Sequence, residues 1–142
     1  MGTEIKLKGD KVIAQIPSIK DKALRINLNE NIYGTFAEIG AGQETVRHFF
    51  RSGGSSGTIA KAMSAYDKDF SDAVYGIEGD GRYVTENRLK KMLTFEGELI
   101  EERLSREKHP NKLFFSYANT VATIDFAKQF KAQFGRTCKE YI

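Results

Sequence analysis

Apolar and polar positions alternate only in short stretches over the first 30 residues of the chain. Apolar residues cluster at 12–16, where Pro17 ends the run, and then return at every second position as Leu24, Ile26 and Leu28. Period-two alternation is typical of strands. Residues 1–30 are therefore predicted to form an extended leader with short strands.

A richer pattern begins at residue 32. Residues 32–39 are aromatic, β-branched and apolar enough to predict a buried strand. Helical pieces are predicted at residues 43–51, 58–66 and 70–75, a second buried strand at 113–118, and a final amphipathic helix at 123–134.

The longest helix is predicted to begin after Thr85, whose side chain can cap it, and to continue to about residue 108. Its period predicts that the following side chains are buried: Leu89, Met92, Leu93, Ile100 and Leu104. The polar side chains on the other face are predicted to contact water: Lys90, Lys91, Glu98, Glu101 and Glu102.

The order strand, helices, strand, helix predicts an α/β fold in which a small sheet is covered by several helices. Residues 31–142 are predicted to form one such domain, as an incomplete or N-terminal part of a larger fold. The chain has 142 residues, which is enough for one domain with its own core.

Composition narrows the function classes. The formal net charge is +3 without a dense Lys/Arg run, so nucleic-acid binding is disfavoured. No apolar stretch approaches the roughly 20 residues of a membrane-spanning helix. A single cysteine and the lack of an apolar leader predict a cytoplasmic protein.

The first candidate binding element is the turn Gly40-Ala41-Gly42-Gln43, placed between a predicted strand and a predicted helix. Such a turn lets backbone N–H groups approach a phosphate closely. Arg47, one turn into the helix, is the predicted charge partner of that phosphate. A tight structural turn explains the same residues, and methyl transfer with S-adenosylmethionine is a third interpretation, suggested by the acidic Glu38.

The second candidate element is a loop of glycines and hydroxyl side chains followed by a lysine. Its predicted ligand-binding residues are Gly53, Gly54, Ser55, Ser56, Gly57, Thr58 and Lys61. Backbone amides, hydroxyls and an ammonium suit a phosphate, although Lys61 is placed inside the predicted helix. The alternative is a flexible connector between helices, capped by Thr58.

The remaining acidic residues, histidines and cysteine do not predict a metal site or a catalytic site. In the cluster Asp67, Asp69 and Asp72, the last two are three apart, so one helix face can present both carboxylates to Mg²⁺, but helix caps and a solvated surface explain these residues better. The chain has two histidines and one cysteine, too few for a zinc site. No metal site and no catalytic residue are predicted, the cofactor is unknown, and whether the protein is an enzyme stays open.

Over roughly residues 31–130 the chain resembles a family of bacterial proteins that carry the labels TonB-dependent receptor and nicotinate-nucleotide or nicotinamide-mononucleotide adenylyltransferase. The resemblance rests on Ile32-Tyr-Gly-Thr-Phe-Ala-Glu-Ile-Gly-Ala-Gly-Gln-Glu44 and on the stretches 47–50, 58–61, 64–67, 71–72, 75–76, 82–84 and 118–122. It implies a nicotinamide-type nucleotide as ligand, and because the family's members are longer, it implies that this chain is an N-terminal portion.

These observations predict a domain that binds a nucleotide or another phosphorylated metabolite through the two glycine-rich segments. The alternative is a non-catalytic interaction module, completed by another subunit, by a second copy of the chain or by further sequence. Exposed apolar surface favours this alternative, because complete monomers rarely show large apolar patches.

Overall fold

The computed structural model describes residues 5–8, 11–14, 16–104, 107–123 and 138–141, with side chains in 16–104 and 107–123. The predicted α/β fold class is confirmed. A four-stranded sheet has the order β4-β3-β5-β6, with β4, β3 and β5 parallel and β6 antiparallel to β5. The strands are β3 (Ile32–Gly40), β4 (Ile59–Ala65), β5 (Leu113–Val121) and β6 (Cys138–Tyr141).

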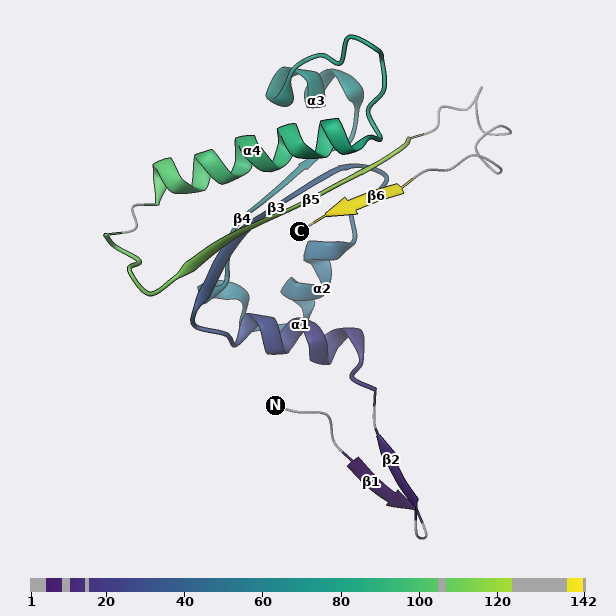
Figure 1. Ribbon diagram of the computed structural model, residues 1–142, viewed down its shortest axis with the longest axis vertical. Helices are drawn as coiled ribbons and strands as arrows, with labels where there is room; N and C mark the ends of the chain where they lie inside the picture. The colour runs from purple at the N-terminus through teal and green to yellow at the C-terminus, as the bar shows by residue number, and fades with distance from the viewer. Residues whose placement is uncertain (1–4, 9–10, 15, 105–106, 124–137, 142) are drawn as a thin grey trace.

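Helices cover both faces of this sheet (Figure 1). On one face lie α1 (Ile19–Asn27) and α2 (Thr45–Ser52), and on the other lie α3 (Lys68–Tyr75) and α4 (Glu86–Arg103). A short 3-10 turn, η1 (Ser55–Gly57), connects α2 to β4. No helix in the described residues is long and apolar enough to cross a membrane.

The first 30 residues differ from the predicted extended leader. A two-stranded hairpin of β1 (Ile5–Lys8) and β2 (Lys11–Ala14) extends away from the sheet in Figure 1, but α1 follows it and packs on α2. Ser18 and Asp21 form a reciprocal capping box at the start of α1. The strand predicted from the alternation of Leu24, Ile26 and Leu28 is therefore wrong. Leu24 and Ile26 lie in α1 and Leu28 caps its end, so the hydrogen bonds of this backbone are made within a helix.

The predicted helix at 58–66 is also wrong, since β4 occupies these residues. Ala, Lys and Met favour helix in isolation. Here the backbone pairs in parallel with β3, in a register that places Lys61 opposite Thr35 and Ser64 opposite Glu38. Tertiary pairing therefore overrides local propensity.

The remaining described elements agree with their predictions to within a few residues. Thr85 caps α4 through a hydrogen bond from the backbone N–H of Arg88. All five predicted core residues of this helix are buried or half-buried, and all five predicted surface residues are exposed. The helix ends at Arg103, before the expected residue 108. The final helix predicted at 123–134 lies almost wholly outside the described residues.

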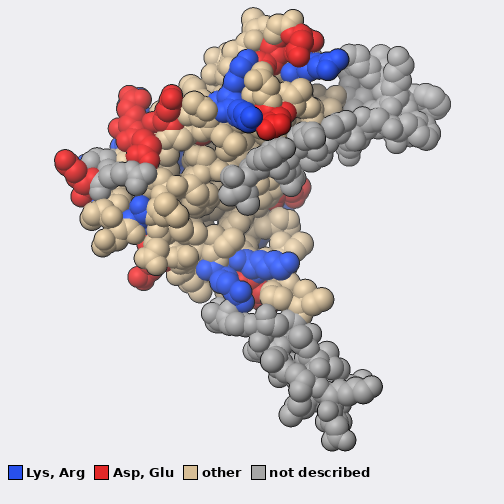
Figure 2. All heavy atoms as spheres, viewed as in Figure 1, with Lys and Arg blue, Asp and Glu red and all other residues tan. Residues whose placement is uncertain are grey.

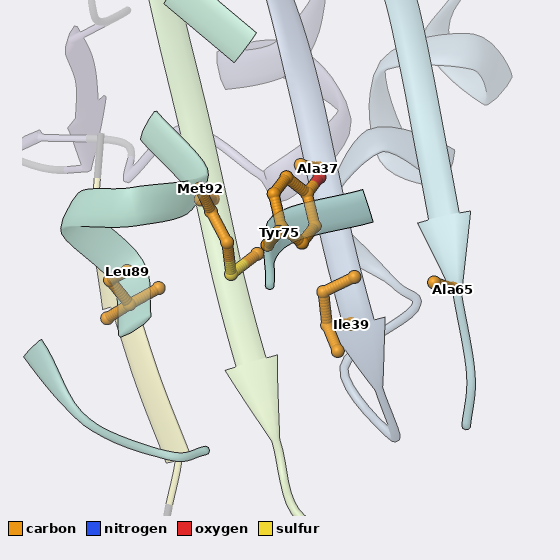
Figure 3. Packing of buried hydrophobic residues seen from close by; sticks show 7 residues of the cluster. Ala37, Ile39, Ala65, Tyr75, Leu89 and Met92 are labelled. Atoms are coloured by element: carbon orange, nitrogen blue, oxygen red, sulfur yellow. The ribbon is translucent and has the colours of Figure 1, made fainter. Parts of the chain in front are cut away.

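The main core lies between the sheet and the helices α3 and α4. It consists of Ala37, Ile39, Ala65, Tyr75, Leu89, Met92 and Ala118, and Figure 3 shows the α4 side chains directed at the strands. On the opposite face, Phe36 packs against the rings of Phe49, Phe115 and Tyr117, with centroids 5.1–5.7 Å apart. Two cores therefore hold the sheet from both sides.

Two charged side chains of α4 are buried although the sequence pattern does not predict it. Arg88 is 1% exposed and donates to the carbonyl of Gly76 and the hydroxyl of Ser71, at 2.6 and 2.8 Å. Glu96 is equally buried, accepts a hydrogen bond from Tyr75 and pairs with Lys61. Buried charges are stable only when paired in this way.

Candidate functional site

The glycine turn after β3 is shaped by its contact with β5. Gly40 has φ +73°, and a Cβ on it would lie 2.0 Å from the carbonyl oxygen of Val121. A Cβ on Gly42 would lie 2.6 Å from the Val121 side chain and 2.8 Å from the Asn119 amide oxygen. Both glycines are required because the turn approaches a neighbouring strand more closely than a side chain allows.

The N-terminus of α2 already has an anion from the protein itself. The Glu38 carboxylate, on a side chain that is 1% exposed, accepts the backbone N–H of Val46 at 2.8 Å. Negative charge at a helix N-terminus is stabilising. The role predicted for a bound phosphate at this helix start is thus filled by an internal side chain.

Gln43 connects the turn to β4. Its amide nitrogen donates to the carbonyls of Glu38 and Gly40, at 2.8 and 3.0 Å. Its amide oxygen accepts the Ser64 hydroxyl at 2.6 Å. The side chain therefore fixes the position of the turn relative to the edge of the sheet.

Beside this turn lies a pocket of about 290 Å³, which we call the α2 pocket. It is lined by Glu38, Gln43, Val46, Arg47, Phe50, Ala62, Met63 and Ser64. Glu38 and Ser64 come from the carboxyl-terminal halves of two parallel strands, the usual edge for ligands in α/β folds. Arg47 is exposed and, in the part of the chain that the structure describes, has no ion-pair partner.

The second glycine-rich segment lies at the other end of α2, about 12 Å away along a helix of this length. Asn27 holds it in place by donating to the carbonyls of Phe49 and Gly53, both at 2.8 Å. Thr58 donates to the carbonyl of Asn27 at 2.7 Å. Residues 53–57 do not line the α2 pocket, so the structure does not bring the two predicted loops to one pocket.

Lys61 does not line the α2 pocket, because its side chain lies on the α4 face of the sheet. It lies on β4, opposite Thr35 of β3, and lines a different pocket on the α4 face. Its ammonium pairs with Glu96. Of the predicted ligand-binding residues, Gln43 and Arg47 line the α2 pocket directly, beside the packed glycines.

The acidic cluster has structural roles. Asp67 caps α3 by accepting the backbone N–H of Phe70 at 2.8 Å, and Asp72 pairs with Lys68 and Arg88. Within the described ranges, no group of three or more His, Cys, Asp or Glu side chains is placed to hold a metal ion.

Sequence reasoning did not assign Phe50 and Ser64 to the site. The signal for Ser64 is its register opposite Glu38, which becomes available only when residues 59–65 are known to form a strand parallel to β3. Phe50 follows Arg47 by three positions, so one helical face carries both side chains.

Comparison with known proteins shows the fold but no family. No family model and no curated protein matches the chain. The structure is similar to the crystal structure of the competence/damage inducible protein CihA from Agrobacterium tumefaciens, with 17% sequence identity and a TM-score of 0.52. The match covers 79% of this chain and 65% of that protein, so the chain spans less than two thirds of its length.

Proposed function

We propose that the protein binds a mononucleotide, or a phosphorylated metabolite of that size, in the α2 pocket. The observation that carries this proposal is the exposed guanidinium of Arg47, which lines a pocket together with an aromatic ring, an amide and a hydroxyl. These are the groups that recognise the phosphate, base and sugar of a nucleotide.

The phosphate is assigned to Arg47. A guanidinium presents a planar pair of donors that matches phosphate oxygens, and it stays charged at every physiological pH. Because Arg47 has no ion-pair partner among the described residues, binding an anion does not require an existing salt bridge to break.

The base and the sugar are assigned to the adjoining side chains. Phe50 is 51% exposed, so its ring can stack on a heterocycle that enters the pocket. Ser64 is exposed as well, and its hydroxyl donates to Gln43 while its lone pairs remain able to accept a sugar hydroxyl.

The pocket volume and the sequence resemblance together select the first ligand to test. About 290 Å³ is near the lower end, roughly 300 Å³, of small-molecule sites, which favours a mononucleotide over a dinucleotide. The family that the sequence resembles is labelled with nicotinamide-type nucleotides, so nicotinamide mononucleotide comes first, with adenosine monophosphate as its comparison.

The test is titration calorimetry with these two nucleotides and with inorganic phosphate, supported by thermal unfolding. A ligand present at about 100 times its Kd stabilises the fold by about 2.7 kcal/mol. Arg47→Gln should weaken mononucleotide binding about tenfold or more, since hydrogen bonds to charged groups contribute about 1.5–3 kcal/mol, and it should leave the melting temperature of the unliganded protein unchanged.

Arg51→Gln is the matched control, because Arg51 lies one turn further along α2, is exposed and does not line the pocket. Its affinity should equal that of the wild type at the same ionic strength. Equal losses in both variants would reduce the role of Arg47 to general surface charge. No heat and no thermal shift with either nucleotide at millimolar concentration would refute the proposal.

A second candidate function is a non-catalytic interaction module, favoured by exposed apolar side chains at one end of β4 and α3. Tyr66 is 63% and Phe70 57% exposed, and β4 is an edge strand of the described sheet. Light scattering should then show concentration-dependent self-association that Phe70→Ser weakens. A monomer at all concentrations, combined with mononucleotide binding, would favour the first function.

A further inference from the structure

A second pocket, of about 440 Å³, lies on the opposite face of the sheet and is independent of the proposed mononucleotide site. We call it the α4 pocket. It is lined by Tyr33, Thr35, Ala60, Lys61, Leu99, Ile100, Arg103 and Leu104. Its volume lies within the range of about 300–1,000 Å³ that is typical of small-molecule sites.

Thr35 distinguishes this pocket from an ordinary packing gap. The residue is 1% exposed, and its hydroxyl has no hydrogen-bond partner in the described part of the chain. The other buried threonines differ, since Thr58 donates to Asn27 at 2.7 Å and Thr120 donates to Tyr83 at 3.1 Å. A buried polar group without a partner is destabilising, and Thr35 lines the α4 pocket, so a ligand that forms a hydrogen bond with this hydroxyl would satisfy it.

The ionised groups that line the pocket leave one cation without a partner. Lys61 pairs with Glu96, whose other oxygen accepts the Tyr75 hydroxyl at 2.8 Å. Arg103 is exposed and has no ion pair within the described residues. The α4 pocket therefore favours a ligand with a single negative charge.

The remaining walls are apolar. Leu99 and Ile100 of α4 line the pocket together with Leu104, which directly follows the helix, and Tyr33 of β3 lines it as well. The ring of Tyr33 is held by His109, with centroids 5.5 Å apart. These walls suit a flat apolar body, because aromatic rings pack well against one another and against aliphatic side chains.

We infer that the α4 pocket binds an aromatic carboxylic acid that carries a hydroxyl group at its far end. The burial of the two polar groups fixes the orientation: Arg103 is at the exposed mouth and takes the carboxylate, and Thr35 is at the buried floor and exchanges a hydrogen bond with the hydroxyl. The ring lies between them, against Tyr33, Leu99 and Leu104.

The experiment measures binding of 4-hydroxyphenylacetate and of phenylacetate, which lacks the hydroxyl, to the full chain by ligand-observed NMR and calorimetry. The hydroxylated probe should bind about fivefold more tightly, as expected for one neutral hydrogen bond to a buried group. Thr35→Val should abolish this preference and raise the melting temperature of the unliganded protein. Arg103→Gln should weaken both probes about tenfold, because each loses a charged partner.

Two controls keep these results specific. Thr120→Val removes a buried hydroxyl that already has a partner, so it should lower the melting temperature and leave the preference between the probes unchanged. Arg51→Gln removes an exposed arginine that lines neither pocket, so it should leave both affinities unchanged. The inference is overturned if neither probe binds at millimolar concentration, if Thr35→Val retains the preference, or if Arg103→Gln binds both probes like the wild type.

Discussion

Replacing Tyr75 with phenylalanine removes one hydroxyl from the core between the sheet and α4. Tyr75 is 8% exposed, and its hydroxyl donates to the Glu96 carboxylate at 2.8 Å, on the side of that carboxylate not paired with Lys61. Its ring also packs edge-on against Phe95, with centroids 5.4 Å apart, and phenylalanine keeps this contact. The substitution therefore removes only the contacts of the hydroxyl, the hydrogen bond to Glu96 and a longer contact with the sulfur of Met63 at 3.4 Å.

At pH 8 the variant should be less stable than the wild type. Tyr75→Phe leaves one oxygen of a buried carboxylate without its donor, and an unsatisfied buried group costs about 1–3 kcal/mol. Glu96 is 1% exposed, so water does not readily replace the lost hydroxyl. The free energy of unfolding should fall by an amount in that range.

The difference should shrink at alkaline pH. Burial, together with the hydrogen bond to Glu96 and the charge of that carboxylate, raises the pKa of Tyr75 well above its usual value near 10. The pKa of Tyr75 is higher in the folded protein than in the unfolded chain, so the unfolded chain releases the proton first. The stabilisation that the protonated hydroxyl gives the folded state is therefore complete below pH 10 and is lost as pH rises. Between pH 9 and pH 11 the contribution of Tyr75 to the free energy of unfolding of the wild type falls by about 1.4 kcal/mol.

Urea denaturation followed by circular dichroism at pH 8, 9, 10 and 11 measures this difference directly. All other side chains are the same in both proteins, so their contributions cancel in the comparison. Tyr66→Phe is the control, because Tyr66 is 63% exposed and its replacement should change neither the stability nor the pH profile. A gap between wild type and Tyr75→Phe that stays constant from pH 8 to pH 11 would refute the reasoning.

Arg88→Met leaves the carboxylates of Asp72 and Glu78 without their buried guanidinium, so urea denaturation should show a loss of about 3–5 kcal/mol. A loss below 1 kcal/mol would show that these carboxylates find other partners. Gly42→Val places a side chain into the space that β5 fills, so calorimetric melting should show a destabilisation of about 1–3 kcal/mol. Gly57→Ala has nothing within 4 Å of its new Cβ and should melt like the wild type.

Local pattern was sufficient for the elements whose burial is regular. Residues 32–39 and 113–118 are rich in apolar, aromatic and β-branched residues, and they form the two central parallel strands β3 and β5. The 3.6-residue period of α4 predicted its buried and exposed faces, because each position of a helix over a sheet faces either the core or water.

Polar chemistry at the site could be predicted only in part. Arg47 and Gln43 follow the glycine turn closely in sequence, so local reasoning placed them beside it. It did not show that β5 fills the space next to Gly40 and Gly42, or that Glu38 occupies the start of α2, because these contacts join segments far apart in sequence.

The sequence by itself therefore determined the α/β class, the central strands and the faces of the long helix, all of which follow from the periodicity of neighbouring residues. Only the tertiary structure decided that residues 59–65 pair as a strand, that residues 19–27 form a helix on α2, and that Arg88 and Glu96 are buried. Each of these depends on a partner elsewhere in the chain: a strand to pair with, a helix to pack against, or an opposite charge to replace water.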